Sequence, residues 1–296
     1  MAARRRCRLN RPSSYWLLFV CACVASNNSL AISWVFNVQW YSTMAALLHY
    51  SIFMPGRLLK YAPLGFLVVS LVGSVTKELV TLPPFYFTSK RNFLNMLFVK
   101  FAWGWTLVLL LPFISIVCYH VHRSVTVILQ RLSALLVGTA VWYFFTWLFM
   151  FIEESTGDCY VSEVNTTLSG YSSRSDCKKN GLFWSGFDIS GHSFLLPYCA
   201  LMIWEETAVI EKINESFKSQ SLRHIVIILF SLLNLLALIW CLMFLCTSFY
   251  YHDIPQKIIG TVFGMLSWYG TYLYWYQKPV SPGHPQIIFT RRHKVK

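Results

Sequence analysis

The stretch Ile225-Val-Ile-Ile-Leu-Phe-Ser-Leu-Leu-Asn-Leu-Leu-Ala-Leu-Ile-Trp-Cys-Leu-Met-Phe-Leu-Cys-Thr247 decides the fold class. It contains no charged residue, and its only strongly polar side chain is that of Asn234. A helix needs about 20 consecutive apolar residues to cross a hydrocarbon core about 30 Å thick. The stretch therefore predicts a helix that spans a membrane.

Apolar blocks of similar length precede and follow this stretch. Of the 296 residues, 56% are hydrophobic and only 12% are charged, whereas an ordinary globular domain has about 25% charged residues. The chain is therefore predicted to be all-α, a polytopic integral membrane protein with six transmembrane helices within residues 58–276. The predicted helices are 58–75, 95–118, 132–152, 189–204, 225–247 and 258–276.

The two ends of the chain differ from this region. Residues 1–57 are basic and partly apolar, and two readings stay open for them: a signal peptide, or an extension associated with the membrane surface. Residues 277–296 form a basic tail. Neither end contributes to the site described below.

Charge predicts the orientation in the membrane. Lys and Arg gather before the first predicted helix, in 119–131, in 205–224 and in the tail. Because cytoplasmic loops retain such residues, both termini are predicted to be cytosolic. Glu205 and Glu206 are predicted to end the fourth helix. The net charge of +13 comes without a basic stripe interleaved with aromatic residues, which argues for membrane lipids and against nucleic acid as the partner.

The loop after the third predicted helix carries the marks of an oxidising compartment. Cys159 and Cys177 lie near its two ends, and Asn165 begins an Asn-Thr-Thr glycosylation sequon between them. We expect this loop to be lumenal and Asn165 to be a glycosylation candidate. A disulfide between the two cysteines is a candidate pairing that spacing alone leaves open.

Two histidines are predicted to emerge on one face of the membrane. The fourth and fifth predicted helices form a hairpin across the membrane, so the start of one and the end of the other lie on the same side. This places His192, in Ser190-Gly-His-Ser193, on the same side as His252. The first turn of a helix binds anions through its free N–H groups. Ser190 or Asp188 can cap that turn, and Gly191 lets an anion approach the backbone.

This arrangement suits phosphoryl chemistry on a lipid. One imidazole can attack phosphorus or orient water while the other protonates the leaving oxygen. The plainer alternative is that each histidine is an interfacial anchor or a helix-cap partner. Lys90, Arg91 and Lys257 lie on the same predicted side and are candidate phosphate ligands, with solvated or snorkelling charges as the alternative. Lys100, inside a predicted helix, either extends to this face or has an unidentified partner.

Patterns for other chemistry are missing from the sequence. It has no Cys-x-x-Cys zinc pattern, no phosphate-binding glycine loop and no Gly-x-Ser-x-Gly elbow. We therefore expect neither a metal site nor a cofactor. A transporter is also disfavoured, because no relay of carboxylates appears inside the predicted helices.

Four segments resemble those of the fat storage-inducing transmembrane proteins. They are Phe183-Trp-Ser-Gly-Phe-Asp-Ile-Ser-Gly-His-Ser-Phe-Leu-Leu196, Lys90-Arg-Asn-Phe-Leu-Asn95, Arg131-Leu-Ser-Ala-Leu-Leu-Val-Gly-Thr-Ala140 and Leu266-Ser-Trp-Tyr-Gly-Thr-Tyr272. The resemblance runs from about residue 61 to 283. It implies a six-span protein of the endoplasmic reticulum, with a lumenal active site, that supports lipid droplet formation with protein partners there.

The resemblance also implies an activity. The family is similar to lipid phosphate phosphatases and hydrolyses fatty acyl-CoA at its diphosphate, so a lipid-phosphatase-like helical core is expected. By this likeness His252 is the nucleophile and His192 the proton donor. The sequence departs from the phosphatase pattern at Ile189, which replaces a Pro, and lacks both the Lys-x6-Arg-Pro motif and the Arg before His252. Other groups must then bind the negatively charged phosphate in place of these missing motifs.

The competing hypothesis is a non-enzymatic protein that binds diacylglycerol or triacylglycerol and partitions neutral lipid into droplets. Aromatic side chains of the predicted helices could line a groove for such lipids, although helix packing and lipid contact are the default explanation for them. These residues are Trp103, Trp105, Trp142, Phe144, Phe145 and Trp147.

Overall fold

The computed structural model describes most of the predicted transmembrane region and part of the tail. The described residues are 59, 61–80, 82–83, 86–161, 173–213, 217 and 219–285. The predicted extension 1–57, the sequon at Asn165 and the tail from 286 onward lie outside them.

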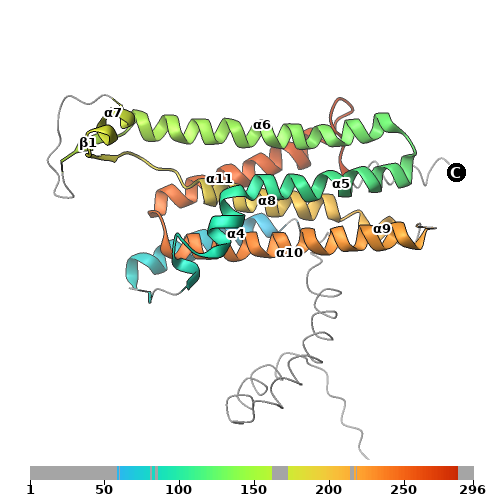
Figure 1. Ribbon diagram of the computed structural model, residues 1–296, viewed down its shortest axis with the longest axis horizontal. Coiled ribbons are helices and arrows are strands. Elements are labelled where there is room, and N and C mark those ends of the chain that lie inside the picture. The colour runs from blue at the N-terminus through green and yellow to red at the C-terminus, as the bar shows by residue number, and fades with distance from the viewer. Residues whose placement is uncertain are drawn as a thin grey trace, which may run out of the picture. The chain divides into compact units, whose positions relative to one another are not determined.

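Six principal helices run up and down through one bundle (Figure 1). They are α4 (Ala62–Leu79), α5 (Ala102–His122), α6 (Val125–Ser155), α8 (Gly191–Thr207), α10 (Gln220–Tyr250) and α11 (Ile254–Trp268). A π-helical segment, Tyr269–Trp275, extends α11. Every predicted transmembrane block thus falls on a helix.

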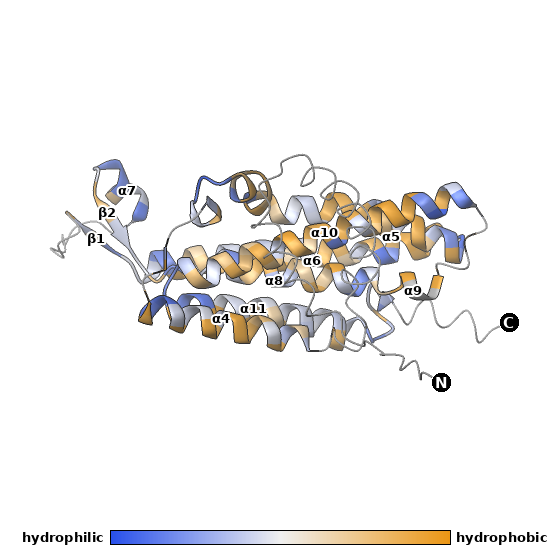
Figure 2. Cartoon of the chain, turned by 90° about the horizontal axis from the view of Figure 1, so that it is seen from below, coloured by the Kyte–Doolittle hydropathy of each residue, from blue (hydrophilic) through white to orange (hydrophobic). Residues whose placement is uncertain are grey.

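In the described part of the chain, four helical segments are long and apolar enough to cross a membrane, so the chain is a multi-pass membrane protein. They are Ala62–Leu79, Leu94–His122, Val125–Ser155 and Gln220–Tyr250. Figure 2 shows apolar residues along these helices and hydrophilic residues at the helix ends and around the small sheet. The other two principal helices, α8 and α11, are shorter.

Two predicted helix ends are wrong. The third helix, α6, begins at Val125 and includes Arg131, which the sequence had suggested to be part of a polar connection. The fourth, α8, does not stop at Glu205 and Glu206 but continues through them to Thr207, and both glutamates are buried. A charged partner inside the bundle, described below, makes this burial tolerable.

A small disulfide-linked unit lies at one end of the bundle, which we call the hairpin end. Strand β1 (Asp158–Tyr160) pairs antiparallel with β2 (Phe183–Ser185), and the short helix α7 (Arg174–Lys179) lies between them in sequence. Cys159 and Cys177 are joined by a disulfide, with their Cα atoms 5.8 Å apart. This unit leads directly into the start of α8 (Figure 1).

Helix α8 is the centre of the bundle, and nearly all of its residues after His192 are buried. Helix α11 approaches it closely because α11 presents glycines. A Cβ atom on Gly260 would lie 2.5 Å from the Ser190 carbonyl oxygen, and one on Gly264 would lie 2.4 Å from that of Phe194. Small residues allow such close packing of helices in membranes. The backbone N–H of Ser190 also donates to the Gln256 carbonyl at 3.2 Å.

An ion pair is buried at the end of the bundle opposite to the hairpin end. The Arg131 guanidinium donates to both carboxylate oxygens of Glu206, at 2.7 and 2.6 Å, and the two side chains are only 1% and 3% exposed. Tyr272 donates to the same carboxylate at 2.7 Å. Arg131 also donates to the carbonyl oxygens of Pro282 and Gly283, which ties the start of the tail to α6.

Breaking this pair from one side should destabilise the protein. In Arg131→Met the Glu206 carboxylate stays buried without its counter-charge, and we expect a loss of about 3–5 kcal/mol in the free energy of unfolding. Denaturant titration in detergent micelles measures this loss. Arg123→Met, at an exposed arginine just before α6, is the matched control and should have little effect. An Arg131→Met protein as stable as the wild type would contradict the role given to the pair.

Candidate active site

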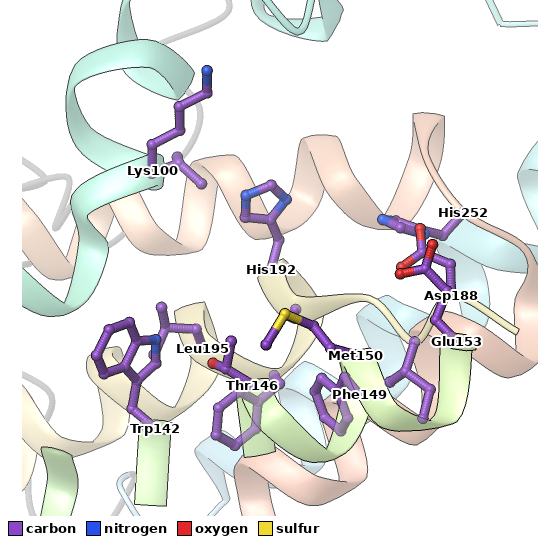
Figure 3. Close-up of a pocket in the computed structure, with 14 residues that line it drawn as sticks. Lys100, Trp142, Thr146, Phe149, Met150, Glu153, Asp188, His192, Leu195 and His252 are labelled. Carbon is purple, nitrogen blue, oxygen red and sulfur yellow. The ribbon is translucent and has the colours of Figure 1, made fainter. Parts of the chain in front are cut away.

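A cavity of about 360 Å³ at the hairpin end contains both predicted catalytic histidines (Figure 3). It lies between the segment before α5, helices α6 and α8, and the turn after α10. Its volume is within the range of about 300–1,000 Å³ that is usual for ligand pockets. The lining residues are Val99, Lys100, Trp142, Thr146, Phe149, Met150, Glu153, Asp188, Ile189, Gly191, His192, Phe194, Leu195 and His252.

His192 lies in the first turn of α8, whose cap is Ser190. The Ser190 hydroxyl oxygen accepts from the Ser193 backbone N–H at 3.3 Å and from its hydroxyl at 2.9 Å. Ser190 and Ser193, two predicted phosphate ligands, are fully buried and do not line the cavity; they stabilise the start of the helix. Gly191 does line it, and a Cβ atom there would meet no atom within 4 Å. An anion therefore has room beside the backbone at Gly191.

His252 follows α10 and has an unusual backbone conformation. Its φ of 50° lies in the left-handed region, which costs a residue other than glycine about 1–3 kcal/mol. Lys77 of α4 holds this turn: its ammonium donates to the His252 carbonyl at 2.6 Å and to the Asp253 carboxylate at 3.4 Å. Sequence analysis did not find Lys77, because 175 residues separate it from His252 and no motif links them.

Asp188 lies beside His252 rather than at the cap of α8. One of its carboxylate oxygens is 3.7 Å from Nδ1 of His252, an ion-pair distance longer than a hydrogen bond. A carboxylate in this position repels a phosphate, because both groups carry negative charge. This geometry fits a partner of His252 better than the predicted role of phosphate ligand.

The predicted cationic ligands have other surroundings. Lys90 and Arg91 are exposed and do not line the cavity, although the Lys90 ammonium lies 6.0 Å from the centroid of the Tyr251 ring, next to His252. Lys257 is fully buried, and its ammonium donates to the Ser248 carbonyl at 2.7 Å. A cation at that position stabilises the end of α10. None of these three cationic side chains lines the cavity.

The turn that carries His252 also contacts the segment before α5. Tyr251 donates its hydroxyl hydrogen to the Thr88 carbonyl, and Tyr250 donates to the Pro83 carbonyl at 3.2 Å. Burial raises the pKa of Tyr251, so its hydroxyl keeps the proton that it donates. These bonds hold the loop with Lys90 near the mouth of the cavity.

Among the residues that the structure describes, Lys100 is the one lysine or arginine that lines the cavity. The helix before α5 is irregular at this point: a π-helix, Leu94–Phe98, is followed by a 3-10 turn, Val99–Phe101. Val99 and Lys100, both in this 3-10 turn, line the cavity. The sequence signal was the lysine inside an apolar block, but nothing in the sequence marked the irregular turn.

A metal site is not evident in the described part of the chain. No group of three or more His, Cys, Asp or Glu side chains among these residues is arranged to hold a metal ion. The two carboxylates that line the cavity each have a partner within the protein. Asp188 lies beside His252, and Glu153 pairs with Arg174 of α7.

Comparison with known proteins identifies the family. Residues 83–229 match the family described as "Fat storage-inducing transmembrane protein". The chain is 50% identical over 235 residues to acyl-coenzyme A diphosphatase FITM2 of Xenopus laevis, which covers 79% of this chain and 90% of that one. Its human counterpart is 49% identical over 227 residues (76% and 86%). Fat storage-inducing transmembrane protein 1 of Bos taurus is 37% identical over 217 residues (72% and 73%). No solved structure matches. By these similarities the chain belongs to the fat storage-inducing transmembrane protein family.

Proposed function

We propose that this protein is a fatty acyl-CoA diphosphatase, which hydrolyses the CoA diphosphate to acyl 4'-phosphopantetheine and adenosine 3',5'-bisphosphate. The observation that carries the proposal is that His192 and His252 line one cavity, although they come from different helices. Relatives of about half identity are named acyl-coenzyme A diphosphatases, which supports the same reaction class.

The surroundings of the two imidazoles favour different roles. Asp188 stabilises positive charge on His252, which suits a nucleophile that becomes a charged phosphohistidine. His192 has no carboxylate at such a distance in the described residues and lies in the helix turn beside the open backbone of Gly191. This suits a proton donor to the leaving oxygen.

The same features support a proposed location. We place the protein in the endoplasmic reticulum membrane, with six spanning helices around a lipid-phosphatase-like core and both termini in the cytosol. The cavity then faces the lumen, on the same side as the Cys159–Cys177 disulfide, which needs an oxidising compartment. An enzyme at this place would act on acyl-CoA and would support lipid droplet formation and membrane homeostasis.

The first test is product analysis by mass spectrometry on purified protein with a long-chain acyl-CoA. His192→Ala and His252→Asn should each lower turnover at least about a hundredfold, because each removes a group that moves a proton or attacks phosphorus. Asparagine is chosen at position 252 because it tolerates a positive φ. The exposed His224, at the other end of α10, is the matched control, and His224→Ala should keep full activity.

Two results would overturn the proposal. A folded variant that lacks either imidazole and still turns over normally would refute the assigned pair. A wild-type protein that binds diacylglycerol or triacylglycerol but releases no product from acyl-CoA would favour a non-enzymatic lipid-binding role.

Lys77 should act as a positioning residue for His252. Lys77→Met removes the donor that holds the His252 carbonyl, and bonds from charged donors are worth about 1.5–3 kcal/mol. We expect kcat to fall about tenfold or more with KM nearly unchanged, because Lys77 holds the nucleophile and not the substrate. Lys77→Arg should restore part of kcat, and Lys178→Met, at an exposed lysine of α7, should behave as the wild type. Steady-state kinetics distinguish these results, and an unchanged kcat in Lys77→Met would contradict the role.

A further inference from the structure

Lys100 is a cation without a counter-charge on the wall of the cavity. Among the described residues, no hydrogen bond, ion pair or aromatic contact holds its ammonium group. The described lysines around the cavity differ in this respect: Lys77 binds the His252 turn, Lys90 lies over Tyr251 and Lys257 binds Ser248. An ionisable side chain inside an apolar block of a membrane protein is usually functional. Lys100 is therefore available for an anion that enters the cavity.

The chemical groups of the cavity follow a fixed order along its length. Figure 3 shows Asp188 and His252 together at one end and His192 between them and Lys100, whose side chain extends away from the histidines; Trp142 and Leu195 lie toward the same end as Lys100 but on the opposite side of the cavity. The Asp188 end is the hairpin end, because Asp188 directly follows the segment that contains β2. His252, His192 and the exposed Lys100 thus follow one another along the bundle, away from the hairpin end.

Helix α6 gives the cavity a polar end and an apolar end. Trp142, Thr146, Met150 and Glu153 line it and recur every three or four residues, so they form one stripe on α6. The stripe extends about 16 Å, at 1.5 Å per residue. It begins at an indole in the depth of the bundle and ends at the Glu153 carboxylate at the hairpin end, where Arg174 pairs with it.

Because the cavity has one polar and one apolar end, an amphiphilic diphosphate is favoured in one orientation. An acyl chain and the arm that joins it to the diphosphate are favoured at the apolar end, where they continue toward the lipid. The adenosine part, which carries a further phosphate, is favoured at the aqueous hairpin end. The phosphate on the pantetheine side then lies toward Lys100, and the phosphate on the adenosine side lies toward His252.

We propose that Lys100 binds the pantetheine-side phosphate and that His252 attacks the adenosine-side phosphorus. This inference rests on the proposed diphosphatase function and specifies which phosphorus reacts. It also makes Lys100 the cation that replaces the arginine and lysine motifs of lipid phosphatases, which this chain lacks. A charge-assisted contact from a lysine to phosphate is among the stronger polar interactions in proteins.

The bonds made and broken follow from this orientation. The His252 ring nitrogen forms a bond to the adenosine-side phosphorus, and the bond from that phosphorus to the bridging oxygen breaks. The bridging oxygen takes a proton from His192 and leaves with acyl 4'-phosphopantetheine. Water then attacks the phosphohistidine, His192 takes up a proton from this water, and adenosine 3',5'-bisphosphate is released. Both histidines return to their initial states.

Turnover in water enriched in oxygen-18 tests the orientation on the wild-type protein. We expect one labelled oxygen in adenosine 3',5'-bisphosphate and none in acyl 4'-phosphopantetheine, as read by mass spectrometry of both products. Label in acyl 4'-phosphopantetheine would overturn the inference while leaving the diphosphatase function intact. Absence of any product would instead overturn the proposed function and this inference with it.

Variants at position 100 test the lysine itself. Lys100→Met should lower kcat/KM for a long-chain acyl-CoA about ten- to hundredfold, as expected for loss of a hydrogen bond to a charged group. Lys100→Arg should restore most of this loss, because arginine also binds phosphate. Lys178→Met, again the control, should match the wild type. Equal kcat/KM in Lys100→Met and wild type, or failure of arginine to restore activity in a protein of unchanged thermal stability, would remove Lys100 from the site.

Discussion

The first turn of α11 is the constraint on which the candidate active site depends, because it holds both histidines. The Gln256 carbonyl accepts the backbone N–H of Ser190, two residues before His192. The Gln256 side chain accepts the backbone N–H of Asp253, the residue after His252, at 3.1 Å. A single residue therefore fixes the start of α8 and the turn after α10. Gly260 and Gly264 make this possible, because any larger side chain would push α11 away from α8.

The cavity exists because the packing around α8 is uneven. On the side of α11, glycines allow backbone contact, whereas α6 faces α8 through large aromatic rings. Phe145 and Phe149 of α6 contact the ring of Phe194, with centroids 5.0 and 5.6 Å apart. Rings of this size hold α6 at a distance, and past their edge the space beside His192 remains open. Close packing on one face and bulky packing on the other thus produce a rigid helix start next to a cavity.

The two ends of the bundle treat buried charge in opposite ways. Arg131 has its full set of partners at one end, since a carboxylate and two carbonyl groups surround it. A buried charge with a purely structural role needs hydrogen-bond and ion-pair partners of this kind for all of its polar groups. At the hairpin end, the Gly191 backbone is open toward the cavity, and Lys100, which also lines it, has no hydrogen bond or ion pair among the described residues. Polar groups that lack protein partners and lie beside a cavity are typical of a binding site for a charged ligand.

The helices and the pairing of the histidines could be predicted from sequence, because both depend on apolar length and on the alternation of direction across a membrane. The partners of the charges could not. Whether Lys257 turns toward the cavity or toward Ser248 depends on the rotation of α11, which is set by glycines that contact a distant helix. Glu206 looked like a helix end because its partner, Arg131, lies in another helix. Lys100 lies in an irregular turn that has no sequence signal.

The depth of the site has a consequence for the reaction itself. Acyl-CoA is an amphiphile, and cleavage at its diphosphate separates an apolar product from a highly charged one. A site deep in the bilayer would release the charged product into hydrocarbon, and a site in open water would expose the acyl chain to water. Both outcomes are unfavourable. At the hairpin end the cavity meets water while the stripe on α6 continues inward, so each product has a favourable direction in which to leave. Placing both imidazoles at the ends of helices, rather than within them, is the arrangement by which an up-and-down bundle can meet this requirement.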